Sequence, residues 1–185
     1  PQRAAERGLP AGGPVAVGGV DAHLGAVGAG VQPGRLVKIL GTSSCDISVF
    51  DVASDLPIIE GISGIVQESV LPGFAGLEAG QAAVGDLFAW AAQLGGDGHD
   101  HDQLSAAAAA LMPGESGLLA LDWNNGNRCL LNDPKLSGLI LGQSLQTTLA
   151  DIYRAMIEAT GFGARTIVDR LEDSGLRIND IAICG

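Results

Sequence analysis

The amino-acid sequence predicts a single α/β domain, and three observations indicate this class. Short apolar runs typical of strands lie near both ends of the 185-residue chain, at 15–17 and 181–183. Between them, apolar residues recur at helical spacing, most clearly over 147–171. Hydrophobic residues make up 46% of the chain and the mean hydropathy is +0.29, which excludes a disordered protein. Strands at both ends with long helices between them favour α/β architecture.

Short strands and turns dominate the first half of the chain. A β-branched run at 15–17 predicts a buried strand, and 22–29 predict a short, glycine-weakened helix. The segments 36–40 and 46–52 flank a tight polar turn and therefore predict a hairpin. Another strand is expected at 65–71, where a Pro-Gly pair ends it.

Helices dominate the second half. Apolar spacing predicts a helix at 83–94, which two glycines end, and alanine-rich 103–112 predict another. A strand is expected at 118–121, and 138–142 form a short apolar link.

The last part of the chain carries the strongest periodic pattern, a helix over 147–171. Gly161 and Gly163 are expected to break this helix in two or to bend it. A final strand is expected at 181–185.

The charge and the cysteines restrict the possible functions. The net charge of −11 leaves no basic stripe for a nucleic-acid backbone. No apolar run approaches the roughly 18–20 residues of a membrane span, and no secretory signal opens the chain. The three cysteines are far apart, which disfavours a disulfide framework or a zinc site. A reduced cytoplasmic protein that binds neither nucleic acid nor membrane is therefore expected.

Asp21 is the first candidate for chemistry. It follows the predicted strand at 15–17 and precedes the predicted helix. An Asp in this place commonly caps the helix by accepting its first free amides. It can equally be a catalytic carboxylate, because ligands of open α/β sheets gather beyond the carboxyl ends of strands. The two interpretations are compatible.

The polar turn Gly41-Thr42-Ser43-Ser44 is the second candidate. Small, hydroxyl-rich turns can present backbone amides to phosphate oxygens, and glycine permits close approach. An ordinary hairpin turn remains the alternative. Neither a Walker motif nor a dinucleotide fingerprint is present in the sequence.

Two further polar segments allow more than one interpretation. His99 and His101 suggest a metal site, but they are near neighbours in a loop without a distant ligand cluster, so no metal is expected there. Trp123 and the amides that follow it suit a sugar, whereas the Asn125-Gly126 pair predicts a tight turn.

The two ends suggest part of a larger protein. The chain begins at Pro1 rather than at Met and stops at Gly185, directly after an apolar run. We therefore expect residues 1–185 to be one domain that is truncated at both ends.

Four blocks of the sequence resemble, in order, the FGGY family of carbohydrate kinases. They are GGVDAHLGAVGAG at 18–30, ILGTSSCDI at 39–47, LPGFAGLEAGQAAVGDLFAW at 71–90 and LDWNNGNRC at 121–129. The second signature of the family is matched over 138–158, except that Gln143 replaces an aliphatic residue. The GLEAGQ and DWNNGNR segments are similar to those of the members that phosphorylate ribulose, rather than glycerol or xylulose.

This resemblance implies the C-terminal lobe of a sugar kinase with an actin-like ATPase fold, in which helices pack on a ribonuclease-H-like mixed sheet. It implies ATP-dependent phosphorylation of ribulose or a related pentulose or pentitol. Asp21 would then be the general base and would also bind the sugar, with Mg²⁺ near it. Glu78 would contact the sugar. The residues that match ATP-binding positions are Gly41, Thr42, Ser43, Gly80 and Gly185.

Two other functions stay open at this stage. A non-catalytic actin-like module could use the same lobe for nucleotide binding or assembly, and a sugar-binding domain could use Trp123. Self-association is also expected, because a single lobe would expose the apolar surface on which the other lobe packs.

Overall fold

The computed structural model describes residues 2–8, 10, 12, 18–51, 58–62, 64–96 and 100–185, so the predicted strand at 15–17 and His99 lie outside the described residues. The helices of the described part are α1 (Gln2–Glu6), α2 (Asp21–Gly28), α3 (Gly85–Gln93), α4 (His101–Ala109) and α5 (Leu149–Asp173). Its strands are β1 (Arg35–Leu40), β2 (Ser44–Asp51), β3 (Gly64–Gln67), β4 (Phe74–Ala79), β5 (Leu119–Leu121), β6 (Leu139–Leu141) and β7 (Asp180–Cys184).

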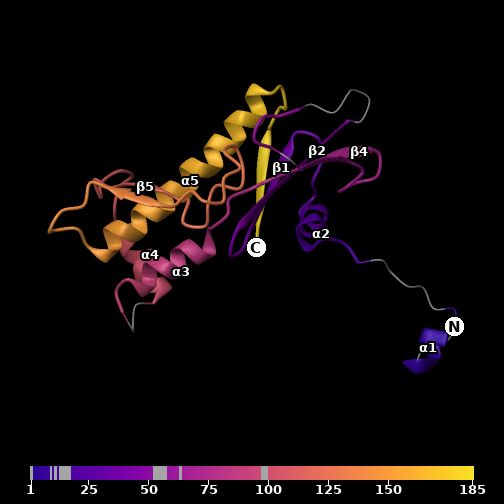
Figure 1. The fold of residues 1–185 in the computed structure, drawn as a ribbon, viewed down its shortest axis with the longest axis horizontal. Helices are drawn as coiled ribbons and strands as arrows, with labels where there is room; N and C mark the ends of the chain where they lie inside the picture. The colour runs from indigo at the N-terminus through magenta and orange to yellow at the C-terminus, as the bar shows by residue number, and fades with distance from the viewer. Residues whose placement is uncertain are drawn as a thin grey trace.

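A five-stranded mixed sheet organises the fold, in the order β3-β4-β2-β1-β7 (Figure 1). The pairs β3–β4, β4–β2 and β2–β1 are antiparallel. β7 pairs with the other side of β1 in parallel, with Val37 opposite Ala182. Parallel pairing places the carboxyl ends of β1 and β7 at the same edge of the sheet. The predicted α/β class and mixed sheet are confirmed.

Both faces of the sheet are covered, as the alternation of side chains along a strand allows. On one face, Val37 and Ile47 pack with Ala26 of α2. On the opposite face, Leu77 of β4 packs with Leu171 of α5, and both are fully buried. α2, which precedes β1 in the chain, is therefore part of the same domain core.

α5 connects the sheet to the remaining elements. Its C-terminal half covers the sheet, whereas its N-terminal half packs against α3 and α4 through Tyr153 and Met156 (Figure 1). None of the described helices is both long enough and apolar enough to cross a bilayer.

Of the two alternatives expected at Gly161 and Gly163, the break is wrong, because α5 is a single helix of 25 residues, and the bend stays a prediction. A capping box starts it, in which Thr148 and Asp151 each accept a hydrogen bond from the backbone amide of the other. Close packing explains why residue 163 is a glycine. A Cβ there would lie 2.7 Å from Oδ2 of Asp122, so glycine allows α5 to approach this carboxylate.

The strands differ from the expectation in three places. The strand expected at 65–71 is shorter, since β3 ends at Gln67 and Glu68 turns with a positive φ of 54°. β4 follows it and was missed, because its mostly buried sequence FAGLEA has neither β-branched residues nor a clear alternation. The apolar link at 138–142 also forms a strand, β6, which pairs with β5.

Candidate functional site

The hairpin turn, residues 41–43, joins β1 to β2 and is held against the start of α3. Gly85 N donates to Gly41 O at 3.0 Å, and Val84 N donates to Thr42 O at 2.9 Å. A Cβ on Gly85 would lie 2.7 Å from Gly41 O, so only glycine permits this contact. Gly41 and Thr42 are exposed. The backbone of the turn is therefore fixed from behind while its outer side faces solvent. Gly85 is a residue that sequence reasoning missed here.

Gly185 lies next to Leu40, the residue before this turn. It follows β7, and a side chain on it would collide with the carbonyl oxygen of Leu40, the last residue of β1. The parallel pairing of β1 and β7 thus brings residues 41–43 and Gly185 to one edge of the sheet. Ligands of open α/β sheets bind at such an edge.

Asp21 is the first residue of α2 and is exposed. Its interpretation as the N-cap is corrected, since Val20 occupies the cap and Asp21 comes one position later. One carboxylate oxygen, Oδ1, accepts a hydrogen bond from Ala22 N at 2.8 Å. A carboxylate in the first turn is stabilised by the helix dipole.

Glu78 lies on β4, opposite Ile47, on the sheet face that α2 covers. Its Oε2 is 3.2 Å from Nε2 of His23, and its Oε1 accepts a hydrogen bond from the thiol of Cys45 at 3.9 Å. Because His23 is two residues after Asp21, this contact ties the start of α2 to Glu78. The structure thereby brings the predicted base and the predicted sugar contact to the same region. His23 was missed, and no local pattern marks it.

Arg128 reaches the same region from the loop after β5. Its Nη2 donates to Ser44 O at 2.6 Å and to Cys45 Sγ at 3.7 Å. Burial alone would lower the pKa of Arg128, but the contact with Cys45 and the charge of Glu78 raise it overall. Gly80 is buried beside this guanidinium. Its contact with the nucleotide stays a prediction.

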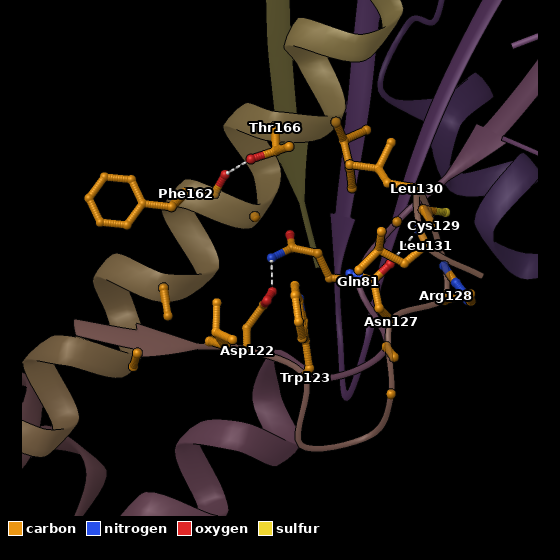
Figure 2. A pocket seen from close by; sticks show the side chains of 18 residues that line it. Gln81, Asp122, Trp123, Asn127, Arg128, Cys129, Leu130, Leu131, Phe162 and Thr166 are labelled. Atoms are coloured by element: carbon orange, nitrogen blue, oxygen red, sulfur yellow. Dashed lines mark hydrogen bonds between the residues drawn. The ribbon is translucent and has the colours of Figure 1, made fainter. Parts of the chain in front are cut away.

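A cavity of about 370 Å³ opens between this loop and α5, lined by Trp123, Phe162 and Arg128 among others (Figure 2). Inside it, Gln81 Nε2 donates to Asp122 Oδ2 at 2.6 Å (Figure 2). Burial raises the pKa of the Asp122 carboxyl, and the hydrogen bond from Gln81 opposes part of this rise. The predicted tight turn after Trp123 is confirmed, since Gly126 N donates to Trp123 O at 2.9 Å.

The histidine loop supplies a helix cap in its described part. The Asp100 side chain accepts a hydrogen bond from Asp102 N and caps α4, and His101 Nδ1 lies 3.1 Å from the Tyr153 hydroxyl. Among the described residues, no group of three or more His, Cys, Asp or Glu side chains is arranged to hold a metal ion.

Comparison with known proteins agrees with this arrangement. The C-terminal domain of the FGGY family of carbohydrate kinases matches residues 36–185. The ribulokinases of Halalkalibacterium halodurans and Shouchella clausii are 44% and 46% identical to the chain, over 100% and 96% of its length. The chain covers 34% and 33% of these relatives, about a third of their length.

Solved structures show the same fold. The xylulose kinase from Rhodospirillum rubrum is 31% identical, with a TM-score of 0.77 over 94% of this chain and 35% of its own. A ligand-bound xylulose kinase from Lactobacillus acidophilus is only 18% identical, yet its TM-score is 0.82 over 100% of this chain and 37% of its own. The sheet topology, the site region and the match over 36–185 lead to one conclusion: the chain belongs to the FGGY family of carbohydrate kinases.

Proposed function

We propose that the protein carrying this chain transfers the γ-phosphoryl group of ATP to a hydroxyl of a pentulose, with L-ribulose as the preferred substrate. The observation that carries the proposal is the contact of His23 with Glu78 at 3.2 Å, which joins the helix that begins at Asp21 to the predicted sugar ligand. The ribulokinase relatives, at 44% and 46% identity, support ribulose as the sugar.

In this proposal Asp21 accepts the proton of the attacking sugar hydroxyl. The sugar oxygen forms a bond to the γ-phosphorus, the bond from that phosphorus to the β–γ bridging oxygen breaks, and ADP leaves with its electron pair. Such a transfer depends on positioning and charge stabilisation rather than on covalent catalysis. An exposed carboxylate at a helix start suits the base, since its Oδ1 is already oriented by Ala22 N at 2.8 Å.

The edge of the sheet at residues 41–43 and Gly185 is the proposed binding site for the phosphates and nucleotide. The backbone of the turn supports this proposal, because it is held in place by three backbone amides at the start of α3. These are the amides of Val84, Gly85 and Asp86. A turn that is already ordered loses little entropy when it binds a ligand. Gly80 is retained in the proposal as a contact near the nucleotide.

Mg²⁺ is proposed to lie near Asp21, together with the phosphates. The Asp21 carboxylate is exposed, and oxygen donors of this kind are the ligands that Mg²⁺ prefers. One or two carboxylates plus substrate phosphates are usual for Mg²⁺, so a single protein ligand fits. When bound, the ion would neutralise charge on the phosphates.

The alternative of a non-catalytic actin-like module is not favoured, because the relatives are named as ribulokinases and the solved structures as sugar kinases. Self-association and a cytoplasmic location stay predictions, as does the assignment of residues 1–185 to one truncated C-terminal domain.

The test uses the complete reading frame that encodes this chain. The purified protein is supplied with Mg-ATP and with L-ribulose, D-xylulose, ribitol or glycerol, and ADP release is followed. We expect turnover to be fastest with ribulose and to be lost in Asp21→Asn. Equal turnover without sugar, or a preference for glycerol, would contradict the proposal.

A further inference from the structure

We propose that Arg128 is a positioning residue that fixes Glu78 for sugar recognition. This inference rests on the proposed function. Arg128 does not contact Glu78 by a hydrogen bond of its own and acts on it through Ala79 and Cys45.

Arg128 joins the ends of two paired strands. Its Nη2 donates to Ser44 O on β2 at 2.6 Å and to Ala79 O on β4 at 3.5 Å. Ala79 directly follows Glu78, and Ser44 directly follows the hairpin turn. Both contacts come from Nη2, whose two N–H groups lie in the fixed plane of the guanidinium, so this one nitrogen can reach both carbonyls.

Gly80 makes room for this guanidinium. Its φ is +146°, in the region that favours glycine, and a side chain there would collide with both Ser44 O and Arg128 Nη2. The fold itself therefore requires a glycine at position 80, because a side chain there would displace Ser44 O or Arg128. The positions of Gly80 and Arg128 depend on each other.

Cys45 connects Arg128 to the carboxylate of Glu78. Its Sγ is 3.7 Å from Arg128 Nη2 and 3.9 Å from Glu78 Oε1, while the other carboxylate oxygen faces His23. Glu78 is thus held on one oxygen from α2 and on the other by a thiol that Arg128 itself contacts. The two sequence segments that resemble ribulose-phosphorylating enzymes, GLEAGQ and DWNNGNR, meet at this point.

The experiment is a double-mutant cycle in the complete protein, with kcat and KM measured for ribulose and for ATP. The variants are Arg128→Gln, Glu78→Gln and the double variant. Arg165→Gln is the control, because Arg165 pairs with Asp169 at 2.6 Å in an exposed contact on α5. Arg128→Lys retains a charge and a long stem and serves as a second variant if Arg128→Gln does not fold.

Arg128→Gln should raise KM for ribulose up to about tenfold, the effect of one charge-assisted hydrogen bond between Glu78 and the sugar that is lost when Glu78 is no longer held in place. KM for ATP should change less, and Arg128→Lys should raise KM for ribulose by a smaller factor. With Glu78→Gln already present, Arg128→Gln should add little, because both changes remove the same sugar contact. The control should match the wild type.

Additive effects of the two substitutions, or an equal rise in KM for ATP, would overturn the positioning role while leaving the proposed kinase intact. A wild-type protein that phosphorylates no sugar would overturn the proposed function, and the inference with it.

Discussion

Gly161 and Gly163 are two residues apart in α5, yet they should respond in opposite ways to replacement by alanine. A Cβ on Gly161 meets nothing within 4 Å. Gly161→Ala should therefore stabilise the protein by the helix propensity of alanine alone, about 0.5–1 kcal/mol. For a domain of this size, such a change raises Tm by about 1–4 °C.

Gly163→Ala should destabilise the protein. Its Cβ would lie 2.7 Å from Asp122 Oδ2 and 2.8 Å from Gln81 Nε2. Both atoms are at the ends of side chains, but they are hydrogen-bonded to each other at 2.6 Å. Gln81 Nε2 also donates to Thr160 O at 2.9 Å. Movement of either group breaks a buried hydrogen bond, which costs about 1–3 kcal/mol and exceeds the gain in propensity.

The pair is measured by thermal and urea unfolding followed by circular dichroism. The two variants share a helix, a substitution and a gain in propensity, so their difference isolates the contact with Asp122 and Gln81. A rise in stability for Gly163→Ala that equals the rise for Gly161→Ala would refute this account of α5.

Three other predictions concern the site. In the complete protein, Asp21→Asn should lower kcat about 10²–10⁴-fold with ribulose and Mg-ATP, while KM for ribulose changes much less; an unchanged kcat would remove the general base from Asp21. Gly41→Val should impair the use of ATP more than it lowers Tm, because a branched side chain blocks approach to the turn, and steady-state kinetics at varied ATP would show whether this is wrong. Burial raises the folded-state pKa of Asp122 above its usual value, so the native state binds the proton more tightly than the unfolded state. Asp122→Asn should therefore raise the free energy of unfolding at neutral pH, and this gain should disappear as the pH falls through the folded-state pKa to the ordinary pKa of Asp; a gain that is constant with pH would contradict the burial argument.

The sequence by itself determined the elements that have a local signal. Helical periodicity located α5, whose boundaries are within two residues of the predicted 147–171. Apolar runs next to turn residues located β1, β2 and β7. β4 had no such signal, because it is mostly buried and contains Gly76, whose absent side chain leaves space for Ser69 and Val70. Local sequence patterns reflect which side chains of a segment are exposed to water. A strand that is covered on both faces has no alternation of apolar and polar residues.

Only the tertiary structure decided how the site is assembled. His23 and Glu78 are 55 residues apart in the chain, and Arg128 is 84 residues from Ser44. The sequence pointed to Asp21 and the turn at 41–43 through position and composition, and to Glu78 through resemblance. It contained nothing that would pair α2 with β4 or direct Arg128 toward β2. Such contacts follow from the order of the strands in the sheet and from close backbone approach at Gly80. Both depend on the packing of distant segments, which no local pattern of residues encodes.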